Sequence, residues 1–174
     1  MRRTFCAFDP ARVRYAEIMT PDRVDEALFI AANGAVLVPW LLLLLAPKAQ
    51  VTRRLAHSPL PALVLVPLYI ACIFFDPRGP QGGNLWSVAG VQAIFASPRT
   101  AVGCWIHYLI FDLFVGAWIA RDARRLAIPH LAAVPCLLVT VFFGPVGYGA
   151  WLLVRAVARR RFDLDEERVP VAPL

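Results

Sequence analysis

Charged side chains are scarce in this sequence. Asp, Glu, Lys and Arg make up only 17% of its 174 residues, whereas soluble domains carry about 25%. Hydrophobic residues account for 59% of the chain. This composition predicts an integral membrane protein, and the length allows four or five spans of about 20 residues in one membrane domain.

The sequence has four cysteines, and their spacing argues against two kinds of site. Three of the four cysteines lie inside apolar runs, and none belongs to a C-x-x-C pair. We therefore expect neither a disulfide framework nor a zinc site. The sequence also lacks a G-x-G-x-x-G, P-loop or nucleophile-elbow motif. The cysteines are Cys6, Cys72, Cys104 and Cys136.

Lysine is nearly absent: Lys48 is the single one, and arginines bring the net charge to +6. The arginines lie in short segments between apolar runs, which favours contact with anionic lipid head groups over nucleic-acid binding. If four spans cross the membrane, the side that holds both termini carries more Lys and Arg, so both termini are predicted to be cytoplasmic. Residues 1–26 show neither a secretory h-region nor a chloroplast transit peptide, so we expect a bacterial inner (cytoplasmic) membrane.

Four apolar runs have about the length of membrane helices. Polar or Gly- and Pro-rich loops separate them, and a fifth apolar segment at 87–97 is too short to span. We therefore predict an all-α polytopic membrane bundle with four transmembrane helices and one short interfacial or re-entrant helix. The four runs are 27–46, 59–75, 101–120 and 130–154.

Particular prolines and glycines in the first and fourth runs are predicted to have structural roles. Pro39 lies in the first run, and Gly144, Pro145 and Gly147 lie in the fourth, where they predict a broken helix. A break inside a membrane is tolerated only where protein or a cavity covers the freed backbone groups. The predicted boundaries are 1–18 for a polar extension, 19–161 for the transmembrane domain and 162–174 for a disordered tail.

The third run carries its polar side chains along one side. On a helical wheel His107, Tyr108 and Asp112 share half a turn with aromatic residues, and the opposite arc is wholly apolar. A charge at mid-membrane costs about 2.5–3.5 kcal/mol even on a lenient scale. We therefore expect this polar arc to face the bundle interior or a cavity and the apolar arc to face lipid. The aromatic residues are Trp105, Phe111 and Trp118, and the apolar arc includes Ile106, Leu113, Gly116 and Ala117.

Three interpretations of the polar arc stay open on spacing alone. Its side chains could hydrogen-bond to polar residues on other helices, a common way for membrane helices to associate. Alternatively, His107 and Asp112 could flank a ligand as an acid–base or ligand site, with Tyr108 between them. A metal site is the third interpretation, although one histidine with Asp112 and Asp122 is a thin ligand set. Asp122 is expected at the membrane interface and Arg155 at lipid head groups. The expected hydrogen-bond partners are Asn33, Tyr69, Gln92 and Thr140.

A distinctive motif covers the third run and the loop after it, GCWIHYLIFDLFVGAWIARDARRLAIP, and PCLLVTVFFGPVGY and Arg155 follow. With LFIAANGAVLVPWLLLLLAP and TRRL near the N-terminus, the chain resembles the abscisic-acid-deficient-4-like family of membrane proteins from about Met19 to Arg155. The plant members of that family are linked to the formation of neoxanthin from violaxanthin. In this redox-neutral isomerisation an epoxide opens, a proton leaves and an allene forms, which requires an acid and a base but no cofactor.

The resemblance implies an apolar carotenoid or related isoprenoid as ligand, held in a lateral cavity between the third span, the broken fourth and the kinked first. By chemical role, Asp112 is the candidate acid and His107 the candidate base, with Tyr108 beside them. A non-catalytic membrane factor that binds carotenoid or scaffolds carotenoid-biosynthesis enzymes is the alternative, and a small transporter is a third possibility. Membrane lipid is the other expected partner. The candidate substrate contacts are Trp105, Phe111, Trp118, Asn33 and Tyr69.

Overall fold

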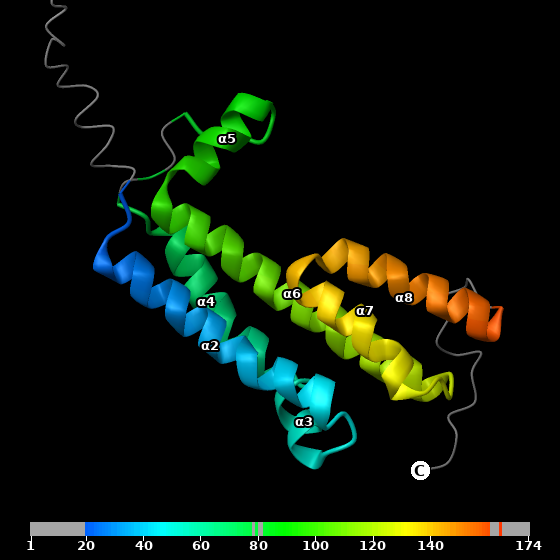
Figure 1. The fold of residues 1–174 in the computed structure, drawn as a ribbon. Helices are drawn as coiled ribbons and strands as arrows, with labels where there is room; N and C mark the ends of the chain where they lie inside the picture. Colours follow the sequence, from blue (N-terminus) through cyan, green and yellow to red (C-terminus); the bar gives the residue numbers. More distant parts are fainter. Residues whose placement is uncertain (1–19, 78, 80–81, 161–163, 165–174) are drawn as a thin grey trace, which may run out of the picture.

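The computed structural model describes residues 20–77, 79, 82–160 and 164. These residues form helices and loops, with no strand among them, which confirms the all-α class. The short helix predicted around 87–97 is present as well. In chain order (Figure 1) the helices are α2 (Arg23–Leu45), α3 (Gln50–Leu55), α4 (Leu60–Phe74), α5 (Val88–Ala96), α6 (Pro98–Arg125), α7 (His130–Phe142) and α8 (Gly144–Arg159).

Three helical segments of the described residues are long and apolar enough to cross a membrane. They are α2, the α3–α4 segment Gln50–Phe74, and α6, with 23, 25 and 28 residues respectively. At about 1.5 Å per residue, α2 and α6 each exceed the roughly 30 Å hydrocarbon core of a bilayer, whereas the α3–α4 segment consists of two helices joined by a turn. Within the described residues, the prediction of four such helices is therefore not confirmed.

The fourth apolar run folds into a helical hairpin instead of a single span. α7 ends at Phe142, and α8 begins at Gly144 and returns alongside α7 (Figure 1). α7 has 13 residues, so it is about 20 Å long and too short to cross the bilayer core. At the end of α8, Arg159 donates hydrogen bonds of 2.7 Å to the carbonyls of Leu126 and Ala127, just before α7. The hairpin therefore enters and leaves at the same end of the bundle.

The residues predicted to break the fourth run also shape the tip of the hairpin. Pro145 lies in the first turn of α8, where its missing N–H leaves no helical bond unmade. A Cβ on Gly147 would overlap the backbone of Thr140, so a glycine is required where α8 passes closest to α7. Pro39, in contrast, is buried inside α2, which continues on both sides of it.

Helices α2, α4 and α6 pack closely because α6 presents small residues to its neighbours. A Cβ on Gly116 would overlap the indole ring of Trp40 from α2. A Cβ on Gly103 would lie 2.8 Å from Cδ1 of Ile73 on α4, which is too close for ordinary contact. Small residues at such contacts are the usual means by which membrane helices approach one another. The core of the bundle therefore lies along the small-residue side of α6.

The two ends of the described chain lie at opposite ends of α6. At its start, Arg99 Nε lies 2.9 Å from Asp25 Oδ1 and Arg99 Nη2 lies 3.3 Å from Asp22 Oδ2, which ties α6 to the start of α2. Arg159 lies beside the other end of α6. Both termini were predicted to share one side; within the described residues the chain instead begins and ends at opposite ends of α6, because the fourth run turns back. Basic residues gather at the Arg159 end: Lys48, Arg53, Arg54, Arg121, Arg124, Arg125, Arg155, Arg159 and Arg160.

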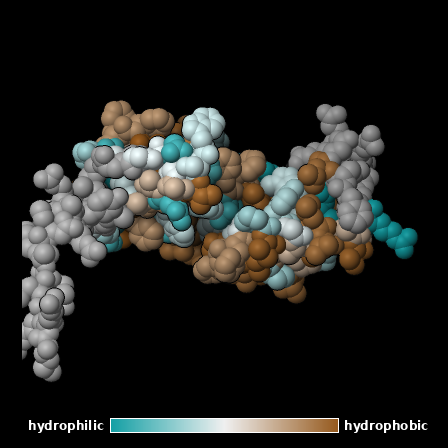
Figure 2. Space-filling view, turned by 90° about the horizontal axis from the view of Figure 1, so that it is seen from above, coloured by the Kyte–Doolittle hydropathy of each residue, from teal (hydrophilic) through white to brown (hydrophobic). Residues whose placement is uncertain are grey.

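Hydrophobic side chains cover much of the surface that Figure 2 shows. Examples of exposed hydrophobic side chains are Ile30 on α2 at 67%, Phe114 on α6 at 63% and Leu153 on α8 at 67%. A surface with this many exposed apolar side chains requires an apolar neighbour. Hydrocarbon chains of a bilayer would meet that requirement.

Candidate functional site

The polar arc of α6 lies on the side that α2 and α4 leave uncovered. His107 is exposed, Tyr108 is 53% exposed, and Asp112 is partly buried. On the opposite arc, Ile106 and Leu113 are at most 3% exposed. The prediction that the polar arc faces the bundle interior or a cavity and the apolar arc faces lipid is therefore wrong for the N-terminal half of the helix, because His107 and Tyr108 are exposed and line neither of the cavities described below. The small residues Gly103 and Gly116 and their apolar neighbours form the helix contact instead.

The C-terminal half of the polar arc is covered by α8 and contains a buried ionic network. Asp122 is 1% exposed. Its carboxylate lies 2.7 Å from Arg125 Nη2 and 3.0 Å from Arg155 Nε, and it accepts a 2.9 Å hydrogen bond from Trp151 Nε1. The guanidinium of Arg155 also lies 5.6 Å from the ring centroid of Trp118, in cation–π geometry. With these partners the network fastens α8 to α6, and both oxygens of the Asp122 carboxylate are engaged within it.

This network differs from what was expected of two of its members. Asp122 was predicted at the membrane interface and Arg155 at lipid head groups, yet each is 1% exposed. The sequence contains one signal that could have revealed it. Trp151 and Arg155 are four residues apart, so they share one face of a helix, and that face has the two polar groups that a buried carboxylate on α6 requires.

Asp112 lies at the tip of the hairpin. A Cβ on Gly144, the first residue of α8, would overlap the Asp112 carboxylate, so the absence of a side chain there makes room for it. The N-terminus of a helix carries a partial positive charge, which faces this carboxyl group. Within the described residues, Asp112 makes no hydrogen bond or ion pair. Asp112 is therefore a carboxyl group in the middle of α6 whose oxygens are available to hydrogen-bond a ligand.

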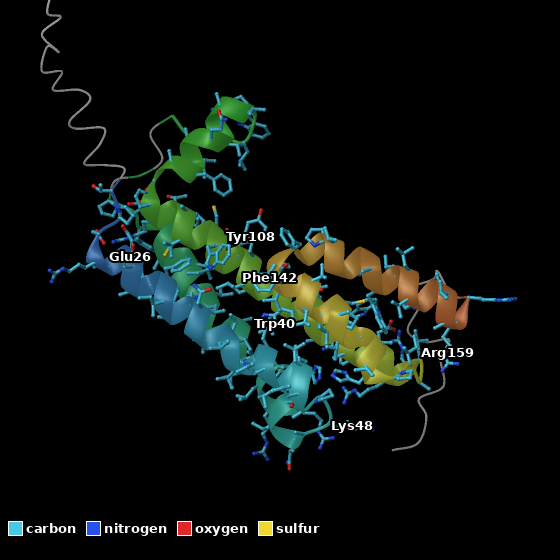
Figure 3. The ribbon with its side chains drawn as sticks, in the orientation of Figure 1. Glu26, Trp40, Lys48, Tyr108, Phe142 and Arg159 are labelled. Atoms are coloured by element: carbon cyan, nitrogen blue, oxygen red, sulfur yellow. The ribbon has the colours of Figure 1, made fainter. Side chains whose placement is uncertain are left out.

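The N-terminal half of the polar arc extends beyond the hairpin tip and stays open. Figure 3 shows Tyr108 projecting from α6 on the side of α8. The His107 ring lies 4.6 Å from that of Phe111 and 6.4 Å from that of Tyr108, centroid to centroid. From α4, the Tyr69 ring lies 6.1 Å from that of His107. Neither His107 nor Tyr108 is hydrogen-bonded to a described residue, so both keep their polar atoms available.

The predicted substrate contacts separate into three groups. Tyr69 and Phe111 accompany His107. Trp105 instead lies against α2, where its Nε1 donates a 3.3 Å hydrogen bond to Asn33 Oδ1. Trp118 packs on Tyr148 of α8, with 5.6 Å between ring centroids. Only the first group therefore lies beside a candidate catalytic residue. Of the predicted hydrogen-bond partners, Asn33 bonds to Trp105 and to the Phe29 carbonyl, and Thr140 to the Cys136 carbonyl.

Two of the cavities between the described residues border α6, and neither of these two is lined by His107, Tyr108 or Asp112. The larger, about 510 Å³, lies between the α3–α4 corner and α6, and Phe111 forms part of its wall. The smaller, about 390 Å³, lies between the starts of α2 and α6 and includes Trp105. Among the described residues, no group of three or more His, Cys, Asp or Glu side chains could hold a metal ion.

Comparison with known proteins bears on these observations. The sequence model of the ABA DEFICIENT 4-like family matches residues 27–151, which contain α3–α7 entire, most of α2 and the first half of α8. The chain belongs to this family. The resemblance inferred from the motifs is thereby confirmed, and the match includes the whole polar arc and the hairpin tip.

A curated member of the ABA DEFICIENT 4-like family is similar to this chain over most of its length. Protein ABA DEFICIENT 4, chloroplastic, of Arabidopsis thaliana is 26% identical over 155 residues, which cover 84% of this chain and 69% of that protein. No solved structure matches. The name of this relative overturns the predicted bacterial inner membrane, because that protein is chloroplastic. The prediction rested on terminal composition and a charge count, and neither identifies the membrane in which a chain resides.

Proposed function

We propose that this protein is an integral membrane protein of carotenoid metabolism that isomerises an apolar isoprenoid by acid–base chemistry. Membership of the ABA DEFICIENT 4-like family supports a relation to abscisic acid and neoxanthin biosynthesis. The three candidate spans support residence in a bilayer, where such a ligand dissolves. An isomerisation of this kind needs no oxidant and no reductant, because the proton removed from carbon balances the proton added to oxygen.

The observation that carries the proposal is the group of open polar side chains on α6 at and beyond the hairpin tip. His107, Tyr108 and Asp112 have no hydrogen-bond partner among the described residues. A polar group left unpaired in an apolar medium is unfavourable, so these three positions favour a ligand or bound water as their partner. In a purely structural arc the carboxyl group would be engaged by neighbouring side chains, as both carboxylate oxygens of Asp122 are lower on the same helix.

The proposed roles follow from the reaction. Asp112 in its protonated form would donate a proton to the epoxide oxygen as the C–O bond breaks. His107 would accept the proton that leaves carbon as the allene forms, and Tyr108 would hold the substrate oxygen between them. The His107 and Asp112 positions differ by five residues, or about 7.5 Å along the helix axis. The reacting part of the substrate would therefore lie along α6 and not across it.

Pigment analysis tests this function. A violaxanthin-containing host would express the wild type, Asp112→Asn, His107→Ala or the control Val146→Ala, a 63% exposed residue near the hairpin tip. With equal protein in the membrane, we expect the wild type and the control to convert the pigment. Each arc variant should lower conversion by 10²-fold or more, as loss of a general acid or base does (about 10²–10⁴-fold).

A second function is favoured by one observation, the absence of these three residues from the walls of both cavities. A protein that binds carotenoid without converting it, and presents it to a biosynthetic enzyme, needs no enclosed reaction site. In that case the arc variants would support the same product formation as the wild type, while removal of the protein would abolish it. The same pigment experiment therefore separates the two functions.

A further inference from the structure

The larger cavity is apolar along most of its length and polar at one end. It lies where the chain turns from α3 into α4, and side chains of α6 close its other side. His57 and Arg121 form the polar end, and Ser58 is beside them. The Ser58 hydroxyl donates to the Arg54 carbonyl at 2.5 Å, so its proton is already engaged. The main apolar wall residues are Pro61, Ala62, Ile110, Leu113, Phe114 and Ala117.

The contact between Arg121 and His57 determines which ring nitrogen carries the proton. Arg121 Nη1 lies 3.3 Å from His57 Nδ1. A guanidinium can only donate, so Nδ1 accepts and the ring is the neutral tautomer with its proton on Nε2. Nε2 is buried and has no hydrogen-bond partner among the described residues. Buried donors without partners are rare in folded proteins and call for an explanation.

We propose that this cavity binds the oxygen-bearing end of the elongated isoprenoid, with the Nε2–H of His57 donating to a neutral hydroxyl or epoxide oxygen. This inference rests on the proposed function. Nε2 is covered from solvent, so a ligand oxygen reaches it only with a small movement of the side chains that cover it. The apolar walls accommodate the hydrocarbon chain, and the unsatisfied donor accounts for the polar end.

The composition of the polar end favours a neutral oxygen over a phosphate or carboxylate. Arg121 is the one cation that lines the cavity, and its guanidinium is engaged with His57. An anionic head group would require several free donors, whereas a single N–H matches the needs of one hydroxyl or epoxide oxygen. An anionic lipid has an apolar chain that would also fit the apolar walls, but its head group is charged. The test therefore includes an anionic lipid as a competing ligand.

One side chain, Phe111, lies between the cavity and the proposed reaction site and borders both. Phe111 lines the cavity and packs against His107, with 4.6 Å between ring centroids. Between Arg121 and His107 lie 14 residue steps, or about 21 Å along α6. A rigid polyene held at His57 would therefore extend along α6 toward His107, and the anchored end would decide which carbon arrives there. His57 is a positioning residue and not a catalytic one.

Ligand binding by the full chain in detergent micelles tests the inference. The probes are zeaxanthin, with a hydroxyl on each end ring, and β-carotene, which has the same carbon skeleton and no oxygen. We expect the wild type to bind zeaxanthin more tightly, by about three- to tenfold, as one added hydrogen bond allows. His57→Phe should remove this preference without changing β-carotene binding, and His57→Gln, which keeps an N–H donor, should restore part of it.

Two further variants guard against misfolding and nonspecific effects. Ala62→Phe fills the cavity and should weaken binding of both probes. His130→Phe alters a histidine outside the cavity, whose Nε2 lies 3.0 Å from the Leu44 carbonyl, and should keep the zeaxanthin preference. Thermal melting confirms that each variant is folded.

Three results would overturn the inference. One is equal wild-type affinity for zeaxanthin and β-carotene, and another is a preference that survives His57→Phe in folded protein. The third is that phosphatidylglycerol displaces zeaxanthin from the wild type and that His57→Phe no longer binds this lipid. That result would assign the cavity to an anionic lipid. Because binding needs no turnover, a preference that persists without pigment conversion would refute only the proposed function. Conversion without the preference would refute only this inference.

Discussion

Replacement of Asp122 by Asn tests whether the buried network holds the hairpin to the bundle. The change keeps the shape of the side chain and removes its negative charge. Arg155 is 1% exposed, so it would remain buried with no carboxylate 3.0 Å from its Nε. Breaking a buried ion pair by removing one partner costs about 3–5 kcal/mol, and we expect Asp122→Asn to lower the free energy of unfolding by about this amount.

A double-mutant cycle shows whether that loss comes from the ion pair. Arg155→Met removes the buried cation and keeps an apolar stem of similar length. Replacing both partners of a buried pair by uncharged groups is often nearly neutral. We therefore expect Asp122→Asn combined with Arg155→Met to be more stable than Asp122→Asn alone, by about 1–3 kcal/mol.

The assay is reversible unfolding in mixed micelles, followed by tryptophan fluorescence. Trp151 reports directly on the network, because its Nε1 donates to Asp122 at 2.9 Å. Val146→Ala, on the exposed side of the hairpin, serves as the control and should change stability by less than about 1 kcal/mol. The role given to the network would be refuted if Asp122→Asn lowered the free energy of unfolding by no more than the control does. It would also be refuted if the changes in unfolding free energy of the two single variants simply added in the double variant.

Three other outcomes follow from the close contacts and the chain path. Gly144→Val should force the α8 start away from Asp112 and lower pigment conversion, while folded protein persists in thermal melts. Gly116→Leu overfills the contact with the indole ring on α2 and should cost about 1–3 kcal/mol of unfolding free energy; no measurable loss would contradict the packing. In a chain without its native cysteines, Arg160→Cys and Trp86→Cys should react with an impermeant thiol reagent from opposite sides of sealed vesicles, and labelling from one side would contradict the chain path.

The positions of the helices could be predicted from the sequence because bilayer thickness and apolar run length are directly related. The runs at 27–46, 59–75 and 101–120 correspond to α2, α4 and α6. The break at Gly144-Pro145 was also predictable from residue type. What composition could not tell is whether a broken run continues across the membrane or turns back. That outcome depends on contacts between helices, such as the glycine that brings α8 against Thr140.

The direction in which α6 faces could not be read from hydrophobicity. Lipid tails are as apolar as a protein core, so an apolar arc fits either environment. Side-chain size was the informative property: Gly103, Gly116, Ala117 and Ala120 lie on the buried side. The role of Arg155 was equally hidden, because its partner Asp122 lies 33 positions earlier and across a helix interface. The existence of the polar arc could be predicted from residue type alone. Which part of the arc stays uncovered by other helices depends on tertiary contacts.

The short hairpin has a consequence for how a lipid-soluble molecule would exchange with the protein. α7 and α8 add width only beside the C-terminal half of α6, so in a bilayer the molecule would be wedge-shaped and broader in one leaflet. In the opposite leaflet, nothing in the described chain stands between the acyl chains and Tyr108, which is 53% exposed. A pigment dissolved there could reach the open arc by sideways diffusion, without a gate. Exchange would then depend on the lipid composition of that leaflet more than on any motion of the protein.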